Sequence, residues 1–136
     1  MMKIESSVKQ VSASQEEVYT RLADLNGLER VRDHIPQDKL RIEAFDRDSV
    51  TLQVPAVGQV TLAITEREPF KCIKMQSTES PIPFNLWAQM EPTSPAESKL
   101  RLTLGVDINP VMAAFVRHPL EEGLEQMAET LARIFQ

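Results

Sequence analysis

Two histidines, His34 and His118, are the only imidazole side chains among the 136 residues. Protein metal sites usually combine several His, Cys or carboxylate ligands at short spacing. Neither histidine has suitable neighbours, apart from Glu121 and Glu122, which follow His118 beyond a proline. We therefore expect no metal site and no cofactor.

Asp33 and His34 could form an acid–base pair, because they are adjacent. Neighbouring residues on a helix do not face one another, however, so an exposed or structurally satisfied histidine is the preferred interpretation. Glu121, Glu122 and Glu125 could be an acid cluster, but their spacing places them on the polar face of a helix, where solvation is the simpler explanation.

Lys71 and Cys72 are the remaining candidates for charge or thiol chemistry. Lys71 lies at the end of a predicted strand, and a lysine in that position usually extends its ammonium group into water. Cys72 is the only cysteine, so it cannot form an intrachain disulfide, which fits a reducing compartment. Gly58 and Gly105 are isolated and form no phosphate-binding loop, and Gly105 inside a strand predicts a bulge.

The charge balance excludes some classes of partner. The net charge is −5, from 20 acidic and 15 basic residues, and no continuous basic run occurs. Nucleic-acid binding draws most of its affinity from basic side chains, so we expect no nucleic-acid partner. The amino terminus lacks the apolar core of a signal peptide, and no apolar segment is long enough to span a bilayer. A cytoplasmic protein without membrane insertion is therefore expected.

The strands that position these residues are indicated by alternation of apolar and polar side chains. A period of two predicts a strand over residues 3–11 and six more between residues 39 and 106. These six cover residues 39–45, 50–54, 60–65, 70–77, 84–91 and 100–106, with breaks at residues 66–69 and a polar loop at 92–98. Short connections make the pairs antiparallel, and clean alternation indicates one buried face.

Helices are predicted on either side of the strand series. Ser14 and Glu17 have the spacing of a capping box, and the helix they begin should end at Asn26 and Gly27. A second short helix is predicted over residues 28–34. Asn109 caps a long helix with Pro110 in its first turn, and the apolar stripe includes Leu120, Leu124, Met127, Leu131 and Ile134. Pro119 should kink or split this helix.

A single α+β domain over residues 1–136 follows from this order, with a seven-stranded curved antiparallel sheet wrapped around the last helix. The order of elements, the length and the closing helix over residues 109–135 resemble the START-related SRPBCC superfamily. The segment from Val8 to Tyr19 is similar to that family's usual entry, a strand followed by a capped helix. The resemblance covers the whole chain. It implies a helix-grip fold with a cavity between sheet and helix, in a superfamily that includes carriers and polyketide cyclase-like enzymes.

The inward-facing side chains give the leading functional hypothesis. None of the predicted inward residues of the sheet is ionisable, which argues against acid–base catalysis and favours an apolar ligand of lipid or polyketide type. The sheet set comprises Leu52, Val60, Leu62, Ile64, Ile73, Met75, Leu86, Ala88, Leu102 and Leu104. The helix adds Met112, Phe115, Val116 and Leu120, beside the predicted kink.

Two alternatives remain open. One is a cyclase- or hydratase-like enzyme in which Tyr19, Asp33 or His34 lines the mouth of the cavity. The other is an interaction module with a filled core, which would use the opposite face of the sheet. Trp87 and Cys72 share that face and suggest a homodimer patch, because an exposed tryptophan often marks a partner surface.

Overall fold

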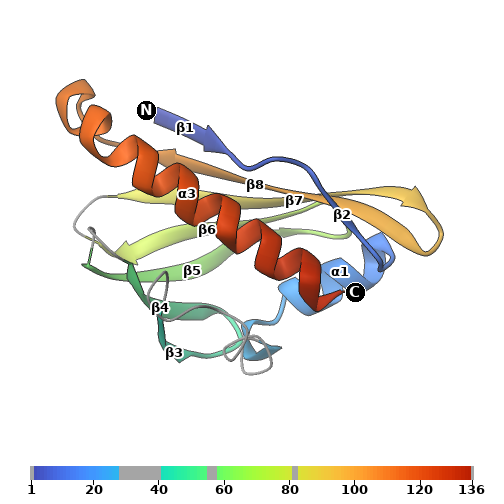
Figure 1. The fold of residues 1–136 in the computed structure, drawn as a ribbon. Coiled ribbons are helices and arrows are strands. Elements are labelled where there is room, and N and C mark those ends of the chain that lie inside the picture. Colours follow the sequence, from blue (N-terminus) through green and yellow to red (C-terminus); the bar gives the residue numbers. More distant parts are fainter. Residues whose placement is uncertain (1, 28–40, 55–57, 81–82, 136) are drawn as a thin grey trace.

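The computed structural model describes residues 2–27, 41–54, 58–80 and 83–135. Within these ranges an antiparallel sheet of eight strands curves around one long helix (Figure 1). The elements in chain order are β1 (Met2–Glu5), β2 (Lys9–Val11), α1 (Gln15–Leu22), the 3₁₀ helix η1 (Leu25–Gly27), β3 (Arg41–Phe45), β4 (Ser49–Val54), β5 (Gly58–Glu68), β6 (Cys72–Glu79), β7 (Phe84–Ser94), β8 (Glu97–Val106) and α3 (Pro110–Ile134). The predicted short helix at residues 28–34 lies outside the described residues.

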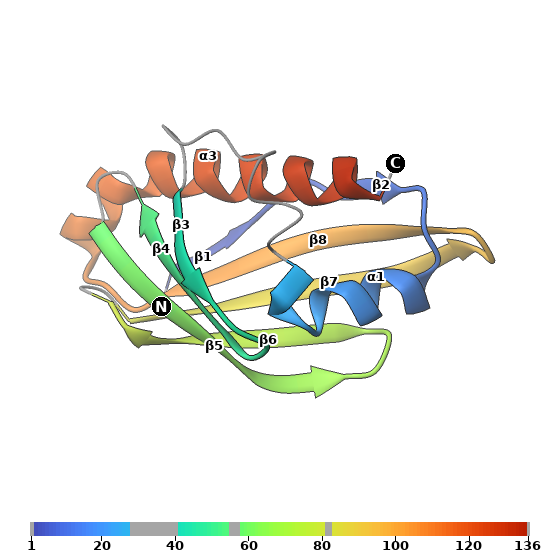
Figure 2. The same ribbon diagram turned by 90° about the horizontal axis from the view of Figure 1, so that it is seen from below.

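The sheet has the order β1-β8-β7-β6-β5-β4-β3, and β2 also pairs with β8. Every pairing between described strands is antiparallel. Helix α3 crosses the concave side and contacts β8, β1 and β2. Figure 2 shows the far strands, β3 and β4, rising towards the level of α3. The predicted α+β helix-grip architecture is therefore confirmed.

The first predicted strand is divided into β1 and β2. Glu5 lies opposite Thr103 and Lys9 opposite Leu100, so the amino-terminal segment carries one residue more than β8 over the same length. The excess is absorbed at Ser6, whose N–H donates to the Leu102 carbonyl at 2.8 Å while its hydroxyl accepts from the Leu102 N–H at 2.9 Å. The Ser6 hydroxyl thus takes the place of a backbone carbonyl as the acceptor from β8. Because this interrupts the pairing, the prediction of one continuous strand was wrong.

Two predicted breaks are strands in the structure. β5 continues to Glu68 through a register shift between Ile64 and Glu66. β7 and β8 extend into the predicted polar loop and turn only at residues 95–96. Pro92 is tolerated there because the β6 ladder begins at Cys72, opposite Gln89, so β7 beyond that point has a free side for a residue without an N–H.

The bulge predicted at Gly105 is absent. Gly105 pairs with Lys3 on one side and Asn85 on the other, in continuous register. The curvature comes instead from the shifts in β3–β4, β5–β6 and β7–β8, because each bulge increases local twist.

Helix α1 begins as predicted, since the Ser14 hydroxyl accepts a hydrogen bond from the Glu17 N–H at 3.1 Å. It ends earlier than predicted, at Leu22, and η1 follows. Arg67 of β5 donates two hydrogen bonds, at 3.1 and 3.0 Å, to the carbonyl of Ala23. These bonds satisfy an acceptor that the end of α1 leaves open, and they fix α1 against the sheet.

Helix α3 begins at the predicted cap, where the Asn109 side chain accepts from the Met112 N–H at 2.9 Å. It continues through Pro119, so the helix is not split there. The other predicted outcome, a kink at Pro119, stays a prediction. The proline removes the bond to the carbonyl of Phe115. Both residues lie on the exposed side of the helix, where water can satisfy that carbonyl.

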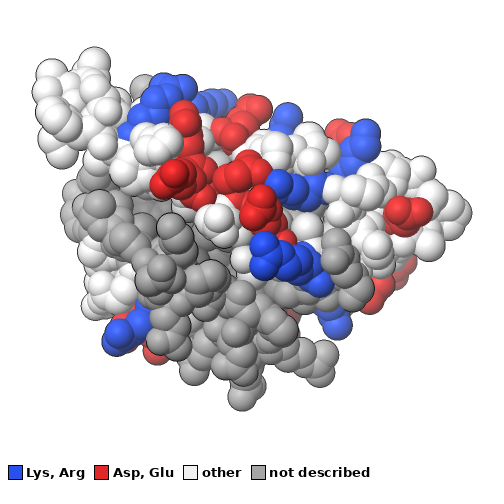
Figure 3. Space-filling model, in the orientation of Figure 1, with Lys and Arg blue, Asp and Glu red and all other residues white. Residues whose placement is uncertain are grey.

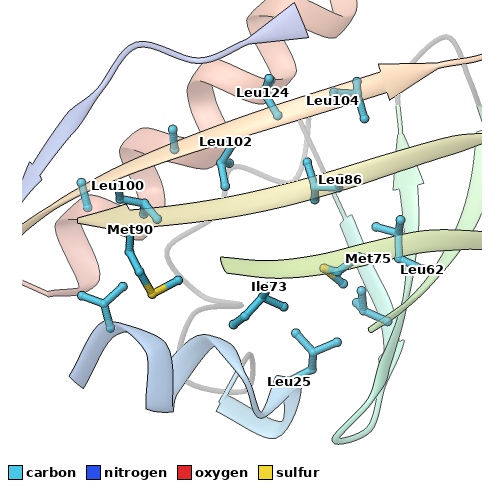
Figure 4. Packing of buried hydrophobic residues seen from close by; sticks show 14 of the residues in the cluster. Leu25, Leu62, Ile73, Met75, Leu86, Met90, Leu100, Leu102, Leu104 and Leu124 are labelled. Atoms are coloured by element: carbon cyan, nitrogen blue, oxygen red, sulfur yellow. The ribbon is translucent and has the colours of Figure 1, made fainter. Parts of the chain in front are cut away.

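The core lies between the concave sheet face and the carboxyl-terminal part of α3 (Figure 4). Its buried apolar side chains come from all eight strands, α1, η1 and α3 and form one cluster. Such a contiguous cluster supplies most of the favourable free energy of folding.

Candidate functional site

The concave face collects the residues that the alternation pattern predicted to point inward. Eight of the ten are buried, and they come from β4, β5, β6, β7 and β8: Leu52, Val60, Leu62, Ile73, Met75, Leu86, Leu102 and Leu104. The other two, Ile64 and Ala88, are half-buried and pack against the same cluster. Figure 4 shows Leu62, Met75, Leu86 and Leu102 pointing into a shared interior.

The same face contains buried residues that were not in the predicted ligand-binding set. They are Ile42, Val50, Met90, Leu100 and Val106. All five continue the two-residue alternation of their strands, so the signal that could have identified them was already in the sequence.

In the described ranges, the fully buried residues with polar side chains all carry hydroxyl groups: Ser6, Ser98, Thr103 and Thr130. The Oδ1 atom of the half-buried Asn85 is buried as well, and it accepts no hydrogen bond from a described residue. Each of the four hydroxyl groups has a partner. Ser98 donates to the Ala13 carbonyl at 2.8 Å, Thr130 to the Gln126 carbonyl at 2.9 Å, and Thr103 to the Gln89 side chain at 3.0 Å. Within the described residues, the fully buried part of this lining has no titratable side chain, a composition that can surround an apolar molecule.

The two halves of α3 relate differently to this face. Between Pro110 and Gly123 no residue is buried, and Ala113, Val116 and Leu120 are half-buried. Of the four helix residues predicted to face a ligand, Val116 and Leu120 therefore lie partly inside. Met112 and Phe115 are on the surface, with exposed fractions of 44% and 75%. The prediction missed Ala113, which lies one turn before Val116.

Beyond Gly123 the helix is anchored to the sheet edge. Leu124, Ala128 and Ala132 are buried at four-residue spacing. Glu125, predicted to be solvated, instead accepts hydrogen bonds from the Ser7 N–H at 2.8 Å and the Ser7 hydroxyl at 2.7 Å, and its carboxylate lies 2.6 Å from the Lys9 ammonium. We call Ser7, Lys9 and Glu125 the clasp. The bond from Lys9, reinforced by Ser7, lowers the pKa of Glu125 to about 2.

The residues of the enzyme alternative are only partly described. Tyr19 is half-buried on α1, and its ring meets Phe70 edge-on, with centroids 5.5 Å apart. Asp33 and His34 lie outside the described residues. His118 is exposed beside Glu122, at 3.2 Å, and Lys71 is exposed as predicted. In the part of the chain that the structure describes, no group of three metal-ligating side chains is found.

The opposite, convex face carries Trp87 and Cys72 together, as the alternation predicted. Trp87 is half-buried between the ammonium groups of Lys3 and Lys74, which lie 5.9 and 5.7 Å from the ring centroid. Burial, with help from Glu68 and Glu66, raises the pKa of the Cys72 thiol. The thiol therefore stays protonated near neutral pH, which makes it a poor nucleophile.

No described helix is long and apolar enough to cross a bilayer.

Known structures share this architecture. A START superfamily protein from Mycobacterium smegmatis superimposes with a TM-score of 0.72 at 17% identity, over 98% of this chain and 96% of that one. Norcoclaurine synthase from Thalictrum flavum, in complex with dopamine and hydroxybenzaldehyde, gives 0.73 at 16% identity, over 98% of this chain and 85% of that one. The di-domain ARO/CYC protein BexL of the BE-7585A biosynthetic pathway gives 0.73 at 18% identity, over 98% of this chain and 46% of that one.

These similarities establish a START-like fold of the SRPBCC type, as the sequence predicted. No protein-family model and no curated protein sequence matches the chain. At this level of identity the shared fold does not carry function with it, because one fold hosts many unrelated sites.

Proposed function

We propose that the protein binds or carries a small apolar molecule of lipid or polyketide type between the concave sheet face and the first half of α3. The observation that carries the proposal is the pairing of an apolar sheet face, free of buried ionisable groups in the described ranges, with a helix half in which no residue is fully buried. Small-molecule sites are typically apolar, with few polar groups.

The comparisons support the choice of a small ligand. One similar structure holds two small aromatic molecules, dopamine and hydroxybenzaldehyde, and another is an ARO/CYC protein of a biosynthetic pathway. Under this proposal the ligand contacts the ten predicted sheet residues and the helix residues Val116 and Leu120. The exposed side chains of Met112 and Phe115 then lie at the entrance.

Native mass spectrometry of protein purified from its own host tests the proposal directly. We expect a retained apolar mass that is released on denaturation. A titration with the neutral dye Nile red adds a site-specific test. Ala88→Phe fills the concave face and should weaken Nile red binding several-fold. Ala63→Phe, the same substitution on the convex face, is the matched control and should leave binding unchanged.

The proposal fails if wild-type protein binds neither host ligand nor dye. It also fails if the two alanine variants bind Nile red equally well. Circular dichroism checks that both variants remain folded, since a half-buried alanine tolerates a larger side chain only if its neighbours yield.

The enzyme alternative places a substrate between the same sheet face and the first half of α3, and it requires a titratable group beside that substrate. Tyr19 is the one described candidate, and its position on α1 beside the turn that holds Phe70 suits that role. Tyr19→Phe removes only the phenolic hydroxyl. Loss of turnover of a poly-β-ketone substrate with unchanged Nile red affinity would favour the enzyme, and unchanged turnover would exclude Tyr19.

A further inference from the structure

Ser77, near the end of β6, brings a hydroxyl group to the concave face of the sheet. It stands two residues after the buried Met75 and directly opposite the buried Leu62 on β5, so alternation and register place its side chain on the same side as theirs. Its neighbour on β7 is Phe84, which pairs in turn with the buried Val106. Ser77 itself is half-buried. The hydroxyl therefore lies among apolar side chains and remains within reach of a ligand.

This part of the sheet belongs to the ligand site proposed above. Val106 is the last residue of β8, and α3 begins four residues later, so Ser77, Phe84 and Val106 form the row of the sheet nearest the start of the helix. Figures 1 and 2 both show the carboxyl end of β6 and the first half of α3 at the same end of the molecule. That half of the helix contains no buried residue, so a ligand between it and the sheet can contact Ser77.

The Ser77 hydroxyl has a hydrogen-bond donor to offer. Its oxygen accepts from the Phe84 N–H at 3.0 Å, and this bond fixes the oxygen at the end of the β6–β7 pairing. A serine hydroxyl also carries one O–H donor. Within the described residues, no group accepts a hydrogen bond from this O–H. What Ser77 presents to a ligand is therefore a donor, and its natural partner is an oxygen atom with a free lone pair.

We propose that Ser77 determines ligand specificity and that the ligand is a neutral molecule with a carbonyl oxygen, such as a ketone or an ester. The carbonyl oxygen accepts the Ser77 hydrogen bond while the hydrocarbon portion lies on the apolar sheet face. This inference rests on the proposed function, because it requires a ligand between the sheet and α3. A pure hydrocarbon fits less well, since it covers the hydroxyl and leaves its donor unpaired at a cost in free energy.

The charges around the site disfavour a carboxylate as the polar group. Burial of an ionised group is costly without a cationic partner, and the described neighbours of Ser77 on the concave face are apolar. Arg67 faces the same side, but it lies opposite Ile73, about 13 Å along β6 from Ser77, and it already bonds to Asp48 and to the Ala23 carbonyl. Figure 3 shows acidic side chains gathered on the outward face of α3, which repel an anionic ligand.

Displacement of Nile red from the full chain by 2-nonanone and by nonane tests the role of Ser77. The two competitors have the same chain length, and only the ketone has an acceptor. The ratio of their dissociation constants within one variant does not depend on the affinity of the dye. Ser77→Ala should reduce the preference for the ketone over the alkane about fivefold, because one neutral hydrogen bond is lost. A purely structural role of Ser77 would change both affinities equally and leave the ratio unaltered.

Two further variants serve as controls. Ser77→Thr retains a hydroxyl group and should keep the wild-type ratio. Ser94→Ala is the matched control, because Ser94 also accepts from a backbone N–H, that of Ala96 at 3.3 Å, but lies exposed beside the turn between β7 and β8. It should keep the wild-type ratio as well.

The infrared carbonyl stretch of 2-nonanone bound to the wild-type protein gives a measurement that needs no variant. Its frequency should be lower than in hexane, because a hydrogen bond weakens the C=O bond. The role of Ser77 is overturned if wild type and Ser77→Ala show the same ratio or if the bound ketone vibrates as it does in hexane. The choice of a neutral ligand is overturned if nonanoate at neutral pH competes more strongly than 2-nonanone.

These outcomes are distinct from a failure of the proposed function. In each of them Nile red still binds and is displaced, so the apolar site stands without the specificity assigned to Ser77. If neither the dye nor the competitors bind the wild-type protein, the proposed function fails, and the role of Ser77 fails with it.

Discussion

The two halves of α3 belong to one continuous helix, yet they differ in how deeply their side chains are buried. From Leu124 onward the helix presents Ala128 and Ala132 to the sheet edge, and small side chains let its backbone approach β1, β2 and β8 closely. Before Gly123, large apolar side chains such as Val111 and Phe115 point to solvent, with exposed fractions of 70% and 75%. The half after Gly123 therefore anchors the helix to the sheet. The half before Gly123 exposes apolar side chains that contribute little to packing and could instead serve a function.

The largest expected effect comes from removing an anchor side chain. Leu124→Ala should lower the free energy of unfolding by about 3 kcal/mol, because it leaves a cavity in a packed region. Val111→Ala, in the exposed half, should change it by less than about 0.5 kcal/mol. Urea denaturation measures both. Similar losses would show that the halves are equally packed.

Overpacking gives the next largest contrast. Ala128 has an exposed fraction of 0%, and Ala128→Leu should cost about 2 kcal/mol because the helix must move away from the strands. Ala114→Leu makes the same change on the exposed half and should be neutral or slightly stabilising through helix propensity. Thermal unfolding followed by circular dichroism distinguishes them, and a neutral Ala128→Leu would contradict close packing.

The clasp sets the pH dependence of the anchor. The folded-state pKa of Glu125 is lowered to about 2 from 4.5, so its stabilisation is complete above pH 4.5 and is lost as the pH falls towards 2. The pKa of Lys9 is raised above 10.5, so its contribution is lost only at alkaline pH, above that value. Glu125→Gln should cost about 1 kcal/mol or less, since the pair is partly exposed and screened by solvent.

Stability curves between pH 2 and pH 7 test the clasp. The wild-type protein should lose more stability than Glu125→Gln on acidification. Glu121→Gln, whose carboxylate pairs with Arg117 at 2.9 Å on the exposed half, serves as the control and should follow the wild-type curve. Parallel curves for wild type and Glu125→Gln would show that the clasp does not contribute to the pH dependence of stability.

The smallest stability effect is expected at the exposed end. Phe115→Ser should alter the free energy of unfolding by less than about 0.5 kcal/mol, because the ring packs against little. Under the proposed function the same change should slow Nile red uptake. A large loss of stability would mean that Phe115 belongs to the core.

Local patterns in the sequence predicted much of this molecule. The strands alternate every two residues, and Ser14 and Asn109 cap their helices through bonds to backbone N–H groups three residues away. These features were predictable because each depends on neighbours a few positions apart. The inward set of the sheet followed from the same alternation, and eight of its ten members are buried.

Features that depend on distant partners were not predictable in this way. The clasp joins residues 118 positions apart, so Glu125 looked like any glutamate on a polar helix face. The division of β1 from β2 depends on the Ser6 hydroxyl meeting Leu102, and the end of α1 depends on Arg67. From the sequence alone, Pro119 suggested a break in the helix. The helix can continue because Pro119 lies on its exposed side, where water can bind the carbonyl that loses its hydrogen bond.

The sequence by itself determined the order of most helices and strands, the buried face of the sheet and the two helix caps, because hydrogen bonding and side-chain direction repeat with fixed local periods. Only the tertiary structure decided which half of α3 is anchored and how Lys3 and Lys74 meet at Trp87. Those outcomes depend on sheet curvature and strand register, which arise from the packing of the whole chain and leave no local pattern.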